Sequence, residues 1–217
     1  MPLVDMKDML HHAYQHGYAV GAFGVAGWDI LEGVVEAAEN RRAPIILSVS
    51  RSYPGTDNIE SLARAVIEIS QRSTIPVAFQ IEVDDDPQAA GAAIGMGCGG
   101  VVFNASSRPL SENVALTKKV VSLAAPRGVL VVGQLGQLES ESANDAAKSA
   151  ASGSTSTPEA KYYIERTGAG CLAVSVSRMN SGGSKHDFFR LSKSTRLLVS
   201  RWGFTVAQVS PMISCGA

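Results

Sequence analysis

The sequence predicts an α/β fold of the (βα)8 TIM-barrel type that is incomplete, with about six to seven βα units. Helical periods and short apolar β runs alternate almost from the first residue, as in consecutive βαβ units. The β runs are nearly continuous in apolar residues, which is typical of parallel strands buried on both faces. A complete barrel usually takes about 250 residues, whereas this chain has 217.

A doubly wound sheet is the other architecture that this alternation permits. Its dinucleotide-binding form carries Gly-x-Gly-x-x-Gly directly after the first strand, and the sequence has no such phrase there. The run Gly95-Met-Gly-Cys-Gly-Gly precedes a strand instead of following one, which is the wrong context. The barrel is therefore the favoured prediction.

Glycine and proline residues mark the starts and ends of the expected helices and strands. The first helix ends before Gly17, a residue type common at C-terminal helix caps. Pro44 and Pro76 open the second and third strands, and a helix that begins at Pro158 stops at Gly168. Apolar residues at helical spacing lead us to expect helices at residues 5–16, 29–41, 58–72, 111–124, 158–168 and 188–199. Apolar β runs lead us to expect strands at residues 18–25, 44–50, 77–83, 100–104, 129–132 and 171–176.

One segment breaks the alternation. Residues 139–157 are rich in Ser, Ala and acidic residues and show no apolar period, so we expect a loop. The loop follows the fifth strand, on the face where a barrel holds its active site, and is either a solvated insertion or a functional segment. We predict one barrel domain over residues 1–217, with a divergent tail from about residue 198.

Composition excludes several classes of function. Nineteen Lys and Arg residues balance 20 Asp and Glu, and the net charge of -1 argues against nucleic-acid and membrane-surface partners. No apolar run reaches the roughly 20 residues of a membrane-spanning helix, and the N-terminal residues do not resemble a signal peptide. The cysteines Cys98, Cys171 and Cys215 are far apart and in no metal-binding spacing. These features predict a soluble cytoplasmic protein.

Several phrases occur in the order and spacing of one enzyme family, from about residue 3 to residue 191. Gly17-Tyr-Ala-Val-Gly-Ala-Phe resembles the family phrase "GYAVPAFN", and Arg42-Ala-Pro-Ile-Ile-Leu-Ser-Val-Ser resembles its second strand. Ser111-Glu-Asn-Val resembles "ENV...T..VV", and Thr157-Pro-Glu-Ala-Lys-Tyr-Tyr-Ile resembles "TDPEEAxxFV". The family is the class II ketose-bisphosphate aldolases, zinc-dependent (βα)8 enzymes that include fructose- and tagatose-bisphosphate aldolase.

The resemblance implies a zinc ion held by three histidines and a carboxylic acid that moves a proton. The family phrase "HxDH" ends strand three, and its acid position is Glu82 here, while its zinc position is Val83. Both carboxylates of "VEAELG" are absent from residues 131–136, and the acidic position of "DGS" is Asn104. The histidines of "G(S/T)AHG" and "HGGSG" have no counterpart in residues 177–182 and 204–217. We therefore expect no metal ligands and no cofactor.

The same resemblance assigns candidate site residues. Glu82 is the expected catalytic residue, and Ser50 at the end of strand two is an expected substrate-binding residue. Apart from the resemblance, Gly182 and Lys185 are expected to bind substrate, because backbone amides and a cation beside Gly residues suit a phosphate group. The expected ligand is a phosphorylated sugar.

Two other groups could bind a metal. His12 and His16 have the i, i+4 spacing of a metal pair, but they precede strand one and are interpreted as surface histidines. Asp84-Asp85-Asp86 could hold a hard cation beside Glu82, or form a solvated loop that caps the next helix. No expected strand contains a Lys that could form a Schiff base.

Three hypotheses follow. The first is an aldolase-like protein of carbohydrate metabolism with catalysis absent or weak, which binds a phosphorylated sugar or a partner protein. The second is an active aldolase-type lyase with an oxygen-ligated metal near Glu82 and Asp84. The third is a truncated gene product, because the family pattern is lost after about Leu197. A homo-oligomer is expected in addition, since an incomplete barrel leaves strand edges open.

Overall fold

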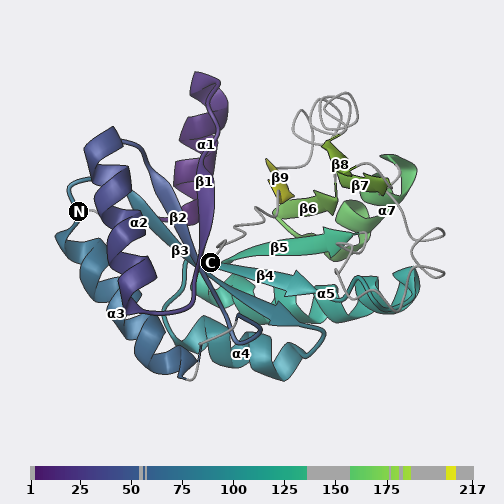
Figure 1. Ribbon diagram of the computed structural model, residues 1–217. Helices are drawn as coiled ribbons and strands as arrows, with labels where there is room; N and C mark the ends of the chain where they lie inside the picture. The colour runs from purple at the N-terminus through teal and green to yellow at the C-terminus, as the bar shows by residue number, and fades with distance from the viewer. Residues whose placement is uncertain are drawn as a thin grey trace.

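A curved sheet of seven parallel strands, with helices along its outer side, forms the body of the computed structural model (Figure 1). The strand order is β1-β2-β3-β4-β5-β6-β9, and β7 and β8 form a separate antiparallel hairpin. The structure describes residues 3–53, 56, 58–135, 157–175, 177–180, 183–186 and 204–208, with the main chain alone beyond residue 173.

The elements alternate as the sequence predicts. The strands are β1 Gly21–Val25, β2 Ile45–Ser50, β3 Val77–Asp84, β4 Gly100–Asn104, β5 Leu130–Leu135, β6 Cys171–Ser175, β7 Ser177–Asn180, β8 Gly183–His186 and β9 Phe204–Gln208. The helices are α1 Met6–His16, α2 Trp28–Arg41, α3 Ile59–Arg72, α4 Pro87–Gly95, α5 Leu110–Ala124, the 3-10 turn η1 Ala125–Arg127 and α7 Thr157–Thr167. None of the described helices is long and apolar enough to cross a membrane.

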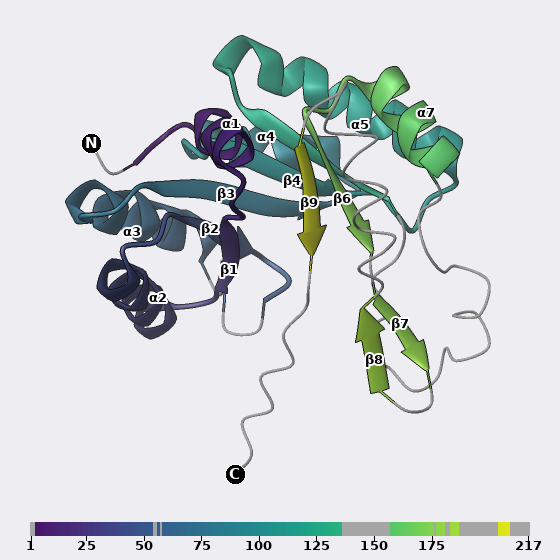
Figure 2. The same ribbon diagram turned by 90° about the horizontal axis from the view of Figure 1, so that it is seen from above.

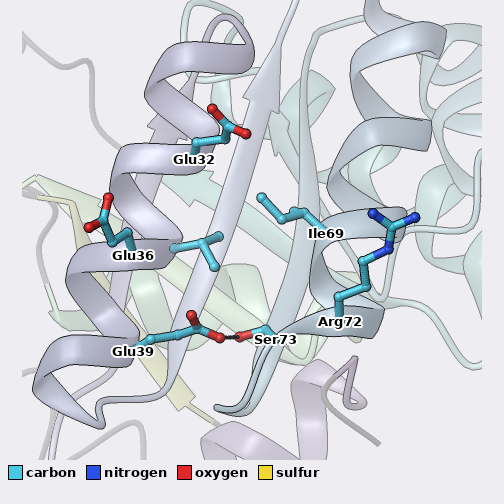
Figure 3. Close-up of a pocket in the computed structure, with 7 residues that line it drawn as sticks. Glu32, Glu36, Glu39, Ile69, Arg72 and Ser73 are labelled. Carbon is cyan, nitrogen blue, oxygen red and sulfur yellow. Dashed lines mark hydrogen bonds between the residues drawn. The ribbon is translucent and has the colours of Figure 1, made fainter.

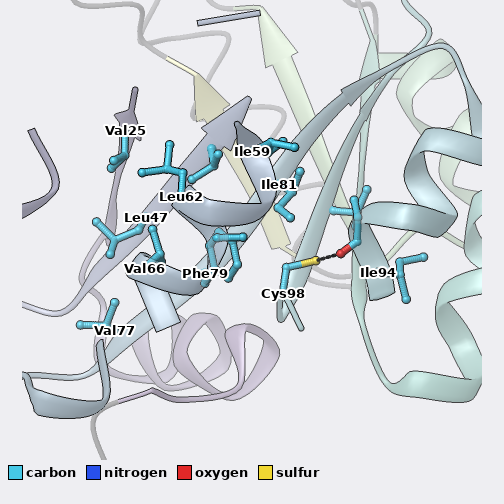
Figure 4. Packing of buried hydrophobic residues seen from close by; sticks show 14 of the residues in the cluster. Val25, Leu47, Ile59, Leu62, Val66, Val77, Phe79, Ile81, Ile94 and Cys98 are labelled. Atoms are coloured by element: carbon cyan, nitrogen blue, oxygen red, sulfur yellow. Dashed lines mark hydrogen bonds between the residues drawn. The ribbon is translucent and has the colours of Figure 1, made fainter. Parts of the chain in front are cut away.

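Alternate residues of each strand separate the two faces of the sheet. One set packs against the helices in the larger apolar core, shown in Figure 4, which includes Leu47, Phe79 and Ile81. The other set lies on the concave face and forms a second cluster with Ile46 and Ala78. The strands are therefore buried on both faces, as their apolar sequences predict.

Helix α1 covers the amino-terminal end of the concave face. Met6 and Met9 pack into the concave-face cluster, and a side chain at Gly100, at the start of β4, would collide with Met6 Sδ. The preceding residue Val4 donates its backbone N–H to the carbonyl of Val77 at 2.9 Å, at the start of β3. Functional side chains on this face therefore have to lie toward the carboxyl ends of the strands.

The predicted incomplete barrel is confirmed, with three differences of detail. A seventh strand, β9, pairs with β6, so that β6 is not an edge of the sheet. The residues between β3 and β4 form helix α4, and its Ala90 and Ala93 are buried against the sheet. The hairpin of β7 and β8 was not expected from the sequence. The predicted helix at 188–199, and the predicted loop except for Thr157, lie outside the described residues.

Candidate functional site

Polar residues replace apolar ones on the concave face where β2 and β3 approach their carboxyl ends. Ser48 lies opposite Gln80 in the register, and Ser50 lies opposite Glu82. Ser48 and Ser50 follow Ile46 at alternate positions of β2, and Gln80 and Glu82 follow Ala78 in the same way in β3. Alternate residues of a strand point to the same side, so these four side chains lie on the concave face. The two predicted site residues Ser50 and Glu82 are thus brought together by the pairing of β2 with β3.

A chain of hydrogen bonds links three of these residues, Gln80, Ser48 and Glu82. Gln80 Nε2 donates to Ser48 Oγ at 3.1 Å, and Ser48 Oγ donates to Glu82 Oε1 at 2.8 Å. Tyr53 Oη also donates to Glu82 Oε1, at 2.7 Å. Ser48 and Gln80 are buried, and a buried polar side chain is stable only when it is hydrogen-bonded. Two hydroxyl groups therefore fix one carboxylate oxygen of Glu82.

Tyr53 reaches Glu82 from the loop that follows β2. Its ring lies over Gly24 of β1, where an added Cβ would come within 3.1 Å of Tyr53 Cε2. Burial raises the pKa of the Tyr53 phenol, and the neighbouring Glu82 carboxylate raises it further. The phenol therefore stays protonated at neutral pH and remains a hydrogen-bond donor to the carboxylate.

The three aspartates after Glu82 have separate partners. Asp84 Oδ2 accepts from Ser52 Oγ at 3.2 Å. Asp85 Oδ2 pairs with Arg108 Nε at 2.5 Å, which helps to raise the pKa of that guanidinium group. Asp86 is the N-cap of α4 and accepts from the backbone N–H of Gln88. Asp86 therefore caps the next helix, as one of the two alternatives predicts. Asp84 is the one aspartate of this run that lies in β3 with Glu82.

The donor set at these strand ends can be compared with the needs of a zinc ion. Val83, at the position that the family resemblance gives to a zinc histidine, is aliphatic and packs against the outer-face core. Asn104, the Cα partner of Asp84 in the register, accepts from Ser106 Oγ at 2.7 Å. Within the described part of the chain, no three His, Cys, Asp or Glu side chains are grouped so that they could hold a metal ion. These residues do not fit a zinc ion.

The remaining predicted residues follow β6. Lys185 lies in β8 and is the Cα partner of Arg178 in β7, so two basic positions are paired across this hairpin. Gly182, between the two strands, lies outside the described residues. His12 and His16 lie on α1, at the opposite end of the sheet from Glu82.

A surface cavity lies away from this site. It has a volume of about 400 Å³ and lies between α2 and α3 in the helical layer, where Glu32, Glu36 and Arg72 line it (Figure 3). Glu39 at its base accepts from Ser73 Oγ and from the backbone N–H of Thr74, at 2.9 and 2.7 Å. Glu39 thus joins the end of α2 to the turn before β3, which is a structural role.

Comparison with known proteins places the chain in a family. The family model that describes fructose-bisphosphate aldolase class-II matches residues 4–200. The chain belongs to the class II fructose-bisphosphate aldolase family. It is 32% identical over 229 residues to a probable fructose-bisphosphate aldolase of Bacillus subtilis, with 100% of this chain and 79% of that protein covered. It is 31% identical over 209 residues to a fructose-bisphosphate aldolase of Giardia intestinalis, with 93% of this chain and 60% of that protein covered.

Solved structures support the fold. The YdjI aldolase from Escherichia coli K12 has a TM-score of 0.81 at 23% identity, over 98% of this chain and 75% of that chain. A putative fructose-1,6-biphosphate aldolase from Coccidioides immitis has a TM-score of 0.80 at 20% identity, over 94% of this chain and 72% of that chain. At these identities the likeness concerns the class II aldolase fold alone.

Sequence reasoning missed the side chains that support the class II aldolase framework around β5. Asn113 Nδ2 donates to the carbonyl of Gln134 at 3.1 Å, and its Oδ1 accepts from Tyr163 Oη at 3.1 Å. Thr117 Oγ1 lies 2.7 Å from Tyr163 Oη. This buried network ties α5 and α7 to the carboxyl end of β5. Tyr53 was missed as well, although its place three residues after Ser50 puts it in the loop at the same strand end.

Proposed function

We propose that this class II aldolase-family protein acts in carbohydrate metabolism with its zinc site lost and its aldol cleavage absent or weak. The observation that carries the proposal is the packing of Val83 in the outer-face core, beside the one carboxylate that the motif retains. An aliphatic side chain cannot coordinate a metal ion, and Glu82 Oε1 accepts hydrogen bonds from the hydroxyl groups of Ser48 and Tyr53.

The chemistry of aldol cleavage supports a low rate. Cleavage produces an enediolate, and its negative charge has to be neutralised in the site. Metal-ion stabilisation of such an oxyanion is worth several kcal/mol, so a site without it loses orders of magnitude in rate. Glu82 can exchange a proton with a ligand hydroxyl, and general acid–base catalysis alone gives about 10²- to 10⁴-fold.

The proposed ligand is a phosphorylated sugar. Ser50 and Glu82 offer a hydroxyl and a carboxylate to the sugar hydroxyl groups at the carboxyl ends of β2 and β3. Gly182 and Lys185 are proposed to bind the phosphate, and the paired basic positions Lys185 and Arg178 support this placement. Cys98 is a buried free cysteine, which supports a reducing compartment, and we propose a cytoplasmic location.

A coupled assay of the cleavage of fructose 1,6-bisphosphate and tagatose 1,6-bisphosphate tests the proposal. With zinc, cobalt or manganese added, we expect no cleavage above background. A metal-dependent turnover of about 1 s⁻¹ that disappears in a Glu82→Gln chain would contradict the proposal.

Ligand binding is tested separately by calorimetry with fructose 1,6-bisphosphate. We expect Lys185→Ala to weaken binding about tenfold or more, because a hydrogen bond to a charged group is worth about 1.5–3 kcal/mol. Lys119→Ala removes the same charge from an exposed position of α5 and should leave the affinity unchanged. Equal losses in the two variants would refute a specific role for Lys185.

A second candidate function is an active lyase with an oxygen-ligated metal near Glu82 and Asp84. The observation in its favour is that Glu82 and Asp84 lie two residues apart at the carboxyl end of β3. Magnesium or manganese would be the metals that suit such ligands. This function requires the metal-dependent turnover described above to disappear in Asp84→Asn as well as in Glu82→Gln.

A further inference from the structure

We infer that His12 and His16 of α1 form a surface site for one divalent transition-metal ion, held by the Nε2 atoms of both rings. The two residues are one helical turn apart and exposed, and their rings stack with centroids 4.0 Å apart and planes at 18°. Metal–imidazole bonds are about 2.0–2.1 Å long, so two nitrogens that share an ion lie within about 4 Å of each other. The ring planes are close to parallel, so the two rings have to turn from this stacked arrangement toward each other before both Nε2 atoms can bind one ion.

The hydrogen bond of His16 fixes which of its nitrogens is free. His16 Nδ1 lies 2.8 Å from the backbone carbonyl oxygen of His12. A carbonyl oxygen only accepts, so Nδ1 carries the proton and Nε2 of the neutral ring carries the lone pair. Metal-binding histidines commonly donate their other N–H to a backbone carbonyl in this way. His16 is thus held in the tautomer that a metal ion requires.

Tyr18 gives His12 a similar support. Helix α1 ends in a left-handed turn at Gly17, with φ 70° and ψ 32°, and the backbone N–H of Tyr18 donates to the carbonyl of Ala13. This turn brings Tyr18 Oη to 2.9 Å from His12 Nδ1. Since a phenol oxygen can accept as well as donate, the N–H of Nδ1 can point to Tyr18 and leave the lone pair on Nε2. In the described part of the chain, neither Nε2 atom has a hydrogen-bond partner.

The donor type selects the class of ion. Imidazole suits copper, nickel and zinc, whereas magnesium and calcium prefer oxygen ligands, and divalent affinities rise to a maximum at copper. The site lies at the amino-terminal end of the sheet, away from Glu82, and is independent of the proposed function. Under this inference, zinc could bind to the chain at His12 and His16 without taking part in aldolase chemistry.

Electron paramagnetic resonance with one equivalent of Cu²⁺ on the full chain at pH 7.5 tests the inference. We expect nitrogen couplings from two imidazoles in the native chain and from fewer than two in His12→Ala and in His16→Ala. His11→Ala, the matched control one residue away on the same helix, should keep the native spectrum. Both replaced residues are exposed and Ala favours helix, so circular dichroism should show α1 intact in each variant.

A native chain without a two-imidazole signal would overturn the inference, as would a signal that survives in both single variants. Tyr18→Phe keeps both imidazoles and should weaken Cu²⁺ binding about 10-fold, the usual size of an effect on the orientation of a ligand. An unchanged affinity in Tyr18→Phe would contradict the support that Tyr18 gives to His12.

The zinc content of the purified chain separates this inference from the proposed function. Zinc that is bound by the native chain and lost from the His12→Ala/His16→Ala double variant supports the surface site and leaves the proposed function standing. Zinc that stays with the double variant places the ion elsewhere, which contradicts the surface site for zinc and the proposed loss of the aldolase site.

Discussion

Gly133→Ala should destabilise the protein because Tyr163 occupies the space beside Gly133. An added Cβ at Gly133 would lie 2.5 Å from Tyr163 Oη and 2.6 Å from Tyr163 Cε1, closer than real Cβ atoms approach. Tyr163 cannot move away freely, because it is buried and its hydroxyl is bonded to Thr117 and Asn113. Overpacking of this kind typically costs about 1–3 kcal/mol.

Removal of the Tyr163 hydroxyl should rescue part of this loss. Tyr163→Phe alone forfeits hydrogen bonds worth about 1 kcal/mol, while Thr117 Oγ1 can still donate to Asn113 Oδ1 at 3.1 Å. Without its hydroxyl, the ring is no longer held against β5 and can shift by the few tenths of an ångström that a methyl group needs. The double variant should therefore lose less stability than the two single losses combined, by about 1 kcal/mol or more.

Urea unfolding of the four chains measures this coupling. We expect the native protein to be the most stable, followed by Tyr163→Phe and then by the double variant. Gly133→Ala should be as stable as the double variant or less stable. Gly33→Ala is the matched control, because an added Cβ at Gly33 in α2 would meet nothing within 4 Å beyond the adjoining backbone of its own helix. That change should stabilise the protein by roughly 0.5–1 kcal/mol. Additive losses in the double variant, or an undiminished stability in Gly133→Ala, would refute the reasoning.

Three further predictions concern other parts of the chain. Burial raises the pKa of the Cys98 thiol to about 12, so iodoacetamide at pH 8 should leave Cys98 unmodified in the native protein and label it in urea, as mass spectrometry would show. Hydrogen bonds from Thr74 and Ser73 lower the pKa of Glu39. The ionised Glu39 carboxylate therefore stabilises the folded protein above the usual Glu pKa, and this stabilisation is lost as the pH falls through the lowered pKa. Urea unfolding should show Glu39→Gln less stable than the native protein at pH 7, with a difference that shrinks toward pH 3; a constant difference would contradict this. Phe23 is 44% exposed on the edge strand β1, so light scattering should find a native oligomer that Phe23→Lys shifts toward monomer, and a native monomer would count against it.

The parallel sheet was predictable because its signals are local. Pro76 and the apolar run after it fix the start of β3 at Val77, and Gly17 ends α1 in the left-handed conformation that glycine tolerates. The predicted first strand began three residues too early, because Tyr18 belongs to the turn that caps α1 and bonds to Ala13. The β7–β8 hairpin and β9 depend on pairing between segments whose sequences lack a strong apolar period. Figure 2 shows this hairpin set apart from the sheet.

The residues of the candidate site also differ in whether local sequence could predict their positions. Ser48 and Ser50, and likewise Gln80 and Glu82, interrupt apolar strands at alternate positions, and this period of two places each pair on one face. The register then joins the pairs, which is why a carboxylate and a hydroxyl could be assigned to one site before the structure was known. Tyr53 could not be assigned, because a loop has no period that sets the direction of a side chain. Its contact with Glu82 depends on the absence of a side chain at Gly24, on a different strand. The same holds for Tyr163 and Gly133, which lie far apart in the sequence, so these packing contacts needed the three-dimensional arrangement.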